Sequence, residues 1–262
     1  VASILAQRPA PLEIVVGDDA SNDATIAIIE RTVAEARAAE PGLRTTLTVL
    51  RRDPPLGVTA NFEATIAACR GAVVALSDQD DVWPAGRLAR LLAVLHDPAV
   101  HLVHSDARMV DAEGAPLGAT LLEVLEAGAA DRAALAAGEA WPVLLRRNLV
   151  TGATVLLRRS LAEQARPFPP AWVHDEWLAA LAAATGGLRL VDEPLLDYRQ
   201  HGGNVIGATR VTGAQRWQRL REPRAARAAR LVARSAALVH RLAAQGAPDG
   251  VLADARAKLA FE

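Results

Sequence analysis

The sequence predicts an α/β protein with a mostly parallel sheet and helices on both faces of it. Three observations support this fold class. Short apolar runs alternate with longer segments of helical periodicity. One run, Ala72–Leu76, lacks polar alternation and leads straight into a cluster of carboxylates, as buried parallel strands do where they end at the edge of a sheet. With 262 residues, 51% of them hydrophobic, the chain can bury a large core.

Strand-like and helix-like segments alternate most regularly in the first hundred residues. Residues 1–7 have the pattern of the end of a helix with no strand before it, so we expect the first strand of the sheet to lie upstream of this sequence. The pattern then predicts strand 12–17, a helix ending near residue 40, strand 45–50, helix 58–70, strand 72–76 and a helix that begins at Pro84. This order implies a parallel sheet with right-handed crossovers.

The rest of the chain mixes shorter strands with Ala-rich helices. The pattern predicts strands 100–104 and 107–110 interrupted at Ser105-Asp106, a helical region 118–145, strand 151–157, a helix from Trp172 to Ala184, and a last short strand 188–191. We expect residues 208–262 to form a basic helical extension that follows the α/β part.

Three carboxylates follow the central strand within four residues, at Asp78, Asp80 and Asp81. They repel one another unless a cation or hydrogen-bond donors neutralise them. Oxygen ligands at a sheet edge suit a hard divalent cation such as Mn²⁺ or Mg²⁺. The alternative is an acidic turn that caps the following helix, since carboxylates are common at helix N-termini.

Cysteine content and hydropathy indicate the compartment. Cys69 is the only cysteine, so no internal disulfide can form, and a buried reduced thiol fits a reducing compartment. We find neither an apolar run long enough to cross a bilayer nor a charged-then-apolar leader. These features predict a cytoplasmic protein.

The net charge of −1 conceals a basic tail on an acidic body. Residues 208–262 carry eleven Arg or Lys and four Asp or Glu, whereas the remainder carries 18 and 26. Arg224, Arg227, Arg230, Arg234 and Arg241 recur at helical spacing, which indicates a basic amphipathic helix. Two interpretations stay open: peripheral contact with anionic lipids at the inner face of the cell membrane, or packing on the acidic body. We do not expect nucleic-acid binding, because the basic face lacks interleaved aromatic residues.

Four motifs occur in order: VVGDDASND, LSDQDDVWPAGRL, HDEWLA and YRQHGGNVIG. In these motifs and their spacing, residues 1–207 resemble family 2 glycosyltransferases, and most closely the rhamnosyltransferase-like branch. The resemblance implies a GT-A fold, with a nucleotide-binding part at about 1–111 and an acceptor-binding part at about 112–207. It further implies transfer of a sugar such as rhamnose, with inversion, from a dTDP- or UDP-linked donor. The implied acceptor is a saccharide or lipid-linked saccharide in cell-surface polysaccharide synthesis.

The resemblance also assigns donor-side roles. Asp18 and Asp19 match the acidic pair that contacts base and ribose, although a simple helix-capping turn would explain them equally well from the residues alone. Asp78 and Asp80 match the D-x-D pair, in which Asp80 would bind the metal and Asp78 the ribose or a metal-bound water. Arg199 would hold the diphosphate, because a guanidinium pairs bidentately with phosphate oxygens. His201 would be a further metal ligand, or else a hydrogen-bonded structural histidine.

Asp175 matches the catalytic base that takes the proton of the acceptor hydroxyl, and its place at a helix start favours the ionised form such a base needs. An N-cap role is the competing explanation, and Glu176 is a possible substitute base. The resemblance and the position of these side chains suggest five acceptor-binding residues: Trp172, Glu176, Trp177, Gly152 and Thr154. Core packing is the alternative for both tryptophans.

Two other functions compete with glycosyl transfer. A nucleotidyltransferase on a related sheet normally needs a Gly-rich, basic phosphate loop near the first strand, and we see none in this sequence. A truncated, non-catalytic protein that binds nucleotide sugars would keep the motifs without turnover.

Overall fold

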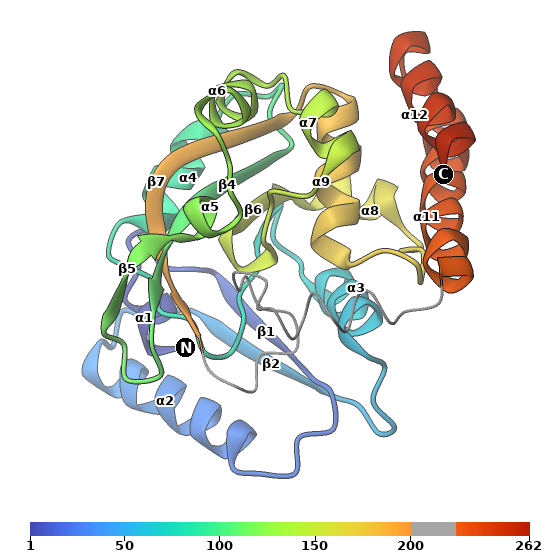
Figure 1. Cartoon of the computed structure of the whole chain (residues 1–262). Coiled ribbons are helices and arrows are strands. Elements are labelled where there is room, and N and C mark those ends of the chain that lie inside the picture. The colour runs from blue at the N-terminus through green and yellow to red at the C-terminus, as the bar shows by residue number, and fades with distance from the viewer. Residues whose placement is uncertain (201–223) are drawn as a thin grey trace.

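The structure, a computed structural model, describes residues 1–200 and 224–262 (Figure 1). The first elements alternate regularly: α1 (Ala2–Leu5), β1 (Glu13–Asp18), α2 (Thr25–Ala39), β2 (Thr46–Arg51), α3 (Val58–Ala68), β3 (Val73–Ala75) and α4 (Arg87–Leu95). The middle of the chain forms β4 (Leu102–Val110), β5 (Pro116–Thr120), α5 (Leu121–Val124), α6 (Ala129–Ala137) and α7 (Trp141–Arg146). The last part forms the 3₁₀ turn η1 (Gly152–Thr154), β6 (Val155–Arg158), α8 (Arg159–Ala165), α9 (His174–Ala184), β7 (Leu188–Arg199), α11 (Arg224–Ala244) and α12 (Asp249–Phe261).

The strands form two sheets, and only part of the pairing is parallel. β1 and β2 pair in parallel along their whole length and lie below the larger sheet in Figure 1. In the larger sheet β4 is central: it pairs in parallel with β7 and antiparallel with β5 and β6. The sequence predicted that β3 would continue a parallel sheet, but it pairs antiparallel with β6. The fold is therefore α/β with a mixed larger sheet.

The core is centred on α9, which is buried on almost every side. Trp177 and all residues from Leu178 to Ala184 are buried. The helix packs against α3, α7 and α8, and its many alanines allow this close approach (Figure 1). Because most of α9 is fixed in the core, the side chains of its first turn have little freedom to move.

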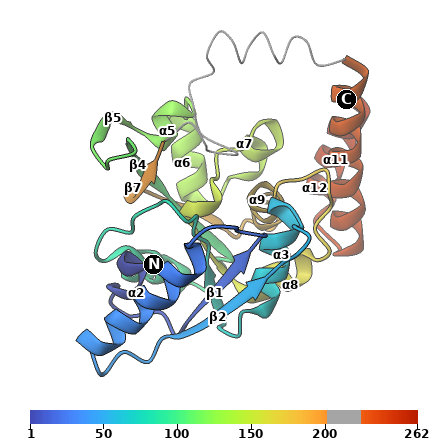
Figure 2. The same cartoon turned by 90° about the horizontal axis from the view of Figure 1, so that it is seen from below.

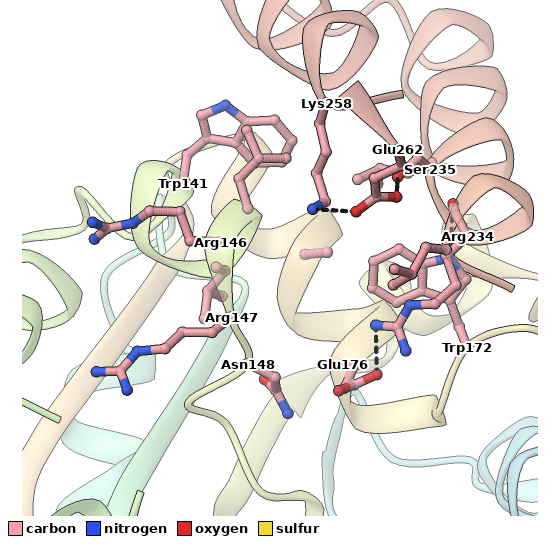
Figure 3. Close-up of a pocket in the computed structure, with 15 residues that line it drawn as sticks. Trp141, Arg146, Arg147, Asn148, Trp172, Glu176, Arg234, Ser235, Lys258 and Glu262 are labelled. Atoms are coloured by element: carbon pink, nitrogen blue, oxygen red, sulfur yellow. Dashed lines mark hydrogen bonds and ion pairs between the residues drawn. The ribbon is translucent and has the colours of Figure 1, made fainter. Parts of the chain in front are cut away.

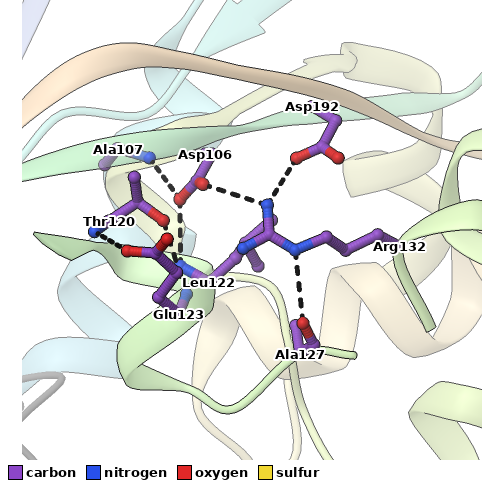
Figure 4. A network of polar contacts seen from close by, with 8 residues as sticks. All are labelled: Asp106, Ala107, Thr120, Leu122, Glu123, Ala127, Arg132 and Asp192. Carbon is purple, nitrogen blue, oxygen red and sulfur yellow. Dashed lines mark hydrogen bonds and ion pairs between the residues drawn. The ribbon is translucent and has the colours of Figure 1, made fainter. Parts of the chain in front are cut away.

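The predicted break at Ser105-Asp106 is wrong, because β4 runs without interruption from Leu102 to Val110. The pairing with β7 shifts register on both sides of Asp106, so the polar residue marks a bulge and not an end. Figure 4 shows why a buried carboxylate is tolerated here. Asp106 accepts hydrogen bonds from the N–H groups of Ala107 (2.8 Å) and Leu122 (2.9 Å), and Arg132 pairs with it at 3.3 Å. Arg132 also pairs with Asp192 at 2.6 Å, which ties β4 and β7 to α5 and α6.

Other predicted boundaries also differ. The helix expected from Pro84 begins only at Arg87, because Val82 first forms a β-bridge to Asp197. Region 118–145 is not one helical stretch: it starts in β5, and Thr120 and Glu123 form a capping box that begins α5. The last strand is longer than predicted and extends through the expected turn at Glu193-Pro194 to Arg199. The register shift of β7 beside Asp106 absorbs that turn.

The helices α11 and α12 lie side by side along one side of the molecule, next to α8 and α9 (Figures 1 and 2). Leu238, Leu242 and Ala255 belong to the main core cluster. Arg241 donates to the carbonyls of Gln164 (2.6 Å) and Pro167 (3.0 Å). Of the two interpretations of the basic helix, these contacts favour packing on the body. Among the described helices, none combines the length and apolar character that crossing a bilayer requires.

Candidate active site

The acidic loop, residues 77–81, starts at the end of β3 and lies beside η1. The N–H of Leu76 donates to the carbonyl of Val155 at 3.1 Å, which aligns the end of β3 with the start of β6. Because η1 directly precedes β6, the carboxylates that follow Leu76 are delivered next to Gly152–Thr154. Pairing with β6 is therefore what brings the acidic loop to this edge of the sheet.

Two carboxylates of the acidic loop have raised pKa values. Burial raises the pKa of Asp78 to about 6, and the charges of Asp80 and Asp175 add to the effect. Burial likewise raises the pKa of Asp81 to about 7; the charges of Asp78 and Asp80 add to this effect, whereas the N–H group of Arg199 and the charge of Arg87 act in the opposite direction. Asp81 Oδ1 accepts that N–H at 3.0 Å, while its buried Oδ2 has no hydrogen-bond partner within the described residues.

The carboxylate ligands that the acidic loop offers suit a hard divalent cation. The loop supplies carboxylate oxygens, the ligands that Mn²⁺ and Mg²⁺ prefer. Within residues 1–200 and 224–262, no three His, Cys, Asp or Glu side chains form a preformed metal cage. Mg²⁺ is commonly bound through one or two carboxylates, with substrate phosphates and waters completing the shell.

Asp175 lies in the first turn of α9, across η1 from the acidic loop. Its Oδ2 accepts the N–H of Gly152 at 2.8 Å, and its Oδ1 accepts the N–H of Glu176 at 2.7 Å. Burial raises the pKa of Asp175, whereas these two N–H groups and the charge of Arg234 act in the opposite direction. The effect of Asp175 on the pKa of Asp78 shows that the two carboxylates share one electrostatic environment.

Gly152 leaves room for Asp175. A Cβ atom at this position would lie 3.0 Å from His174 Nε2 and 3.4 Å from Asp175 Cβ. Its neighbour Thr154 is fully buried, and its hydroxyl donates to the carbonyl of Thr151 at 2.7 Å. The prediction that Thr154 contacts an acceptor is therefore wrong, because the side chain reaches no open surface.

The two tryptophans predicted to stack on a sugar differ in position. Trp177 is completely buried, and its Nε1 donates to the carbonyl of Ala165 at 2.9 Å, so the prediction for Trp177 is wrong. Trp172 and Glu176 instead line a cavity of about 120 Å³ between α7, α9, α11 and α12 (Figure 3). Arg234 from α11 lies over the ring of Trp172 and pairs with Glu176 within this cavity.

Asp18 and Asp19 lie at the end of β1 and hold local turns. Asp18 Oδ1 accepts the N–H of Ser21 at 3.1 Å. Asp19 accepts the N–H groups of Leu56 (2.7 Å) and Gly57 (2.8 Å), which fixes the turn before α3. These contacts agree with the turn-forming alternative, and the nucleotide-binding role of both residues stays a prediction.

Arg199 has a different environment from the one predicted. Its guanidinium donates to three backbone carbonyls, those of Asp80 (2.9 Å), Asp111 (3.3 Å) and Ala112. The side chain thus braces the acidic loop against the turn that follows β4, while the predicted contact with a diphosphate stays untested. His201 lies outside the described residues.

Two arginines important to the site escaped the sequence analysis. Arg87 is fully buried, donates to the carbonyls of Ala153 (2.7 Å) and Leu195 (3.1 Å), and lies over Trp83. It ties α4 to η1 beside the acidic loop. In the sequence, the position of Arg87 directly before the apolar stripe that begins at Leu88 was the feature that could have indicated its role. Arg234 was assigned only to a basic face, because nothing in the sequence tells which face of α11 meets the body.

Comparison with known proteins shows what the chain is similar to. The family model described as Glycosyl transferase family 2 matches residues 1–121, a little under half of the 262 residues. The succinoglycan biosynthesis protein ExoO of Rhizobium meliloti is 28% identical over 204 residues, which are 77% of this chain and 55% of ExoO. A glycosyltransferase of Nostoc sp., itself uncharacterized, is 28% identical over 219 residues, 78% of this chain and 60% of the relative.

A solved structure has a similar fold. The mannosyltransferase PcManGT from Pyrobaculum calidifontis, solved in complex with GDP-Man and Mn²⁺, matches with a TM-score of 0.55 at 21% identity over 99% of this chain and 68% of that chain. This likeness confirms the GT-A fold class. The chain spans only 55% to 60% of the length of the curated relatives described above.

Proposed function

We propose that the protein is an inverting glycosyltransferase that uses a nucleotide-diphosphate sugar. The observation that carries the proposal is the convergence of Asp175 with the acidic loop at η1. Asp175 is fixed by the N–H of Gly152 at 2.8 Å, and its charge acts on Asp78 from a distant part of the sequence. A base for the acceptor and carboxylates for the leaving group are both needed in such a reaction, and here they face one edge of the sheet.

The reaction is a single displacement. The acceptor hydroxyl oxygen attacks the anomeric carbon on the face opposite the diphosphate, and the bond from that carbon to the phosphate oxygen breaks. The nucleoside diphosphate leaves with the bonding electron pair, and Asp175 takes the hydroxyl proton. In-line attack inverts the anomeric configuration. The two N–H groups on Asp175 and the charge of Arg234 favour the ionised carboxylate that this role requires.

Asp80 would hold Mn²⁺ or Mg²⁺, Asp78 would reach the ribose or a metal-bound water, and Asp81 would support both. When bound, the cation would act as the Lewis acid that neutralises the leaving diphosphate. Asp81 Oδ2, which has no hydrogen-bond partner in the part of the chain that the structure describes, and the raised pKa values of Asp78 and Asp81 support this assignment. Arg199 would keep the loop in place through the carbonyl of Asp80. His201 remains the proposed further ligand.

The substrates are proposed by class. PcManGT binds GDP-Man and Mn²⁺, and ExoO acts in succinoglycan biosynthesis; these relatives support a nucleotide-sugar donor and a saccharide acceptor. A dTDP- or UDP-linked sugar, with rhamnose first, and a saccharide or lipid-linked acceptor are the candidates from the sequence. Glu176, Trp172 and Gly152 would lie on the acceptor side, and Asp18 and Asp19 on the nucleotide side. The finer assignment to cell-surface polysaccharide synthesis belongs to this proposal.

Calorimetric titration of UDP-, dTDP- and GDP-sugars with and without Mn²⁺, followed by transfer assays, tests the proposal. We expect Mn²⁺-dependent donor binding that Asp80→Ala weakens by about tenfold or more, equivalent to about 1.4 kcal/mol. Glu139→Ala, an exposed carboxylate on another face, is the matched control and should bind normally.

Three results would contradict the proposal. Equal donor affinity in Asp80→Ala and the control would contradict the assignment of Asp80 as a metal ligand. Pyrophosphate release from a nucleoside triphosphate would identify a nucleotidyltransferase. Metal-dependent binding without transfer to any saccharide acceptor would favour a non-catalytic binding protein.

A further inference from the structure

One arginine of the C-terminal helices reaches the start of α9. Arg234 Nη2 lies 2.7 Å from Glu176 Oε2, and its guanidinium carbon lies 4.2 Å from the centre of the Trp172 ring. The backbone carbonyl of Arg234 also accepts the Trp172 Nε1–H at 3.0 Å. Figure 3 shows the guanidinium held between the ring and the carboxylate. Three separate contacts therefore join one residue of α11 to the segment that carries Asp175.

The helix that carries Arg234 is firmly anchored. One turn further along α11, Leu238 and Leu242 are buried in the main core cluster, and Arg241 is hydrogen-bonded to two carbonyls at the end of α8. The side chain of Arg234 is itself only 25% exposed, so its pairing with Glu176 is screened less than a surface ion pair. The contact is thus a fixed part of the fold.

Asp175 and Glu176 are neighbours in the first turn of α9, so whatever holds Glu176 also orients Asp175. Asp175 has a defined orientation, because its two carboxylate oxygens accept hydrogen bonds from the N–H groups of Gly152 and Glu176. The charged or titratable groups around it are Asp78 from the acidic loop, its chain neighbours His174 and Glu176 on α9, and Arg234 from α11; of these, Asp78 and Arg234 interact with it through their charges. Arg234 is the positive charge among these four, because burial keeps His174 neutral near pH 7 by lowering its pKa to about 4.

We propose that Arg234 is a positioning residue for the base Asp175, and that α11 is thereby part of the catalytic unit. Arg234 holds the first turn of α9 through Glu176 and Trp172 and supplies a positive charge near the carboxylate. This inference rests on the proposed glycosyltransferase function. It differs from a purely structural role in one respect: the charge of Arg234 should influence how Asp175 titrates.

The test compares Arg234→Gln, Arg234→Lys and Glu176→Gln in pH profiles of kcat and kcat/KM for sugar transfer. Arg234→Gln removes the positive charge, so we expect the acid limb of kcat to move to higher pH and kcat at neutral pH to fall about tenfold or more, with donor KM unchanged. Arg234→Lys should restore the position of the acid limb. Glu176→Gln removes the partner that neutralises Arg234, so its acid limb should move to lower pH. Arg227→Gln, an exposed arginine on the same helix, is the matched control.

Opposite shifts in Arg234→Gln and Glu176→Gln would support positioning through charge, because a loss of packing would move both variants alike. Thermal unfolding of each variant shows whether the fold is kept, and if Arg234→Gln does not fold, the Lys and Glu176→Gln variants still decide the outcome. Acid limbs that coincide with that of the control would overturn the inference while transfer by the wild-type chain upholds the proposed function. Absence of transfer by the wild-type chain would contradict both.

Discussion

Asp175 is held by opposing influences. Burial favours its protonated form, whereas the N–H groups of Gly152 and Glu176 and the charge of Arg234 favour the carboxylate. A general base works best when its pKa is poised close to the working pH. Burial raises the pKa of Asp175, and three neighbours act in the opposite direction in favour of the carboxylate that a base needs.

The buried position of His174, next to Asp175, leads to a prediction about how the stability of the fold changes at acid pH. Its ring stacks on Phe62 with 3.8 Å between centroids, and burial lowers its pKa to about 4. The unfolded chain binds a proton near pH 6.5, while the folded chain does not until about pH 4. Stability is therefore complete above pH 6.5 and is lost as the pH falls toward 4. At pH 4.5 the loss due to this residue should be about 2 to 3 kcal/mol.

The variant His174→Phe keeps an aromatic ring and removes the titration. In denaturant unfolding at pH 7 and pH 4.5, the variant should lose about 2 to 3 kcal/mol less than the wild-type protein on acidification. The wild-type protein is the internal reference, because His104, whose pKa burial also lowers to about 4, is present in both. Equal losses in the two proteins would contradict the assignment.

At the scale of elements, the acidic loop is held by arginines and not by regular structure. Arg199 at the end of β7 binds the loop through its backbone N–H and its guanidinium, and reaches the turn after β4 with the same side chain. Arg87 joins α4 to η1 on the other side. The carbonyl of Asp80 and the carboxylate of Asp81 are thus fixed before any ligand arrives, which preorganises this part of the loop.

The variant Arg199→Gln tests this bracing. It should weaken Mn²⁺-dependent donor binding by about tenfold, because a loosened loop presents its carboxylates less precisely. Calorimetric titration measures the effect, with Arg90→Gln as the control, since Arg90 forms an exposed pair with Glu193 away from the loop. Unchanged donor affinity in Arg199→Gln, with normal binding in the control, would show that the loop keeps its shape without the brace.

Sequence patterns predicted the elements better than their pairing. The motifs predicted that Asp78 and Asp175 share a site; the charge of Asp175 does act on Asp78, while their roles stay a prediction. Asp106 misled the prediction, since a buried carboxylate with three donors is visible only in three dimensions. Trp177 and Thr154 misled it for a related reason: α9 is buried on almost every side, so position in a motif does not show which side chains reach the surface.

At the scale of the molecule, α11 and α12 complete the core. Leu238 and Leu242 are 2% and 1% exposed, and Trp141 donates to Asp254 at 3.1 Å. Burying two leucine side chains contributes roughly 3 to 6 kcal/mol. Arg234 and Arg241 face the body, whereas Arg227 and Arg230 are exposed. The assignment of residues 208–262 as an extension stays a prediction, although α11 and α12 contribute buried side chains to the main core.

Removal of residues 208–262 tests the division into parts. We expect the shortened chain to lose cooperative thermal unfolding or to unfold at least about 6 °C lower, because the faces of Trp172 and Trp141 become exposed. Scanning calorimetry of both chains measures this. An unchanged melting temperature would show that the helical extension is separable from residues 1–207.

The convergence of Asp175 with the acidic loop is tested most directly by one variant, Asp175→Asn. Transfer should be measured at saturating donor and Mn²⁺, with donor affinity determined on the same preparation. We predict that kcat falls by about 10² to 10⁴ while the dissociation constant of the donor stays within about threefold of wild type, since the base acts on the acceptor and not on the donor. Wild-type turnover by Asp175→Asn would contradict the account.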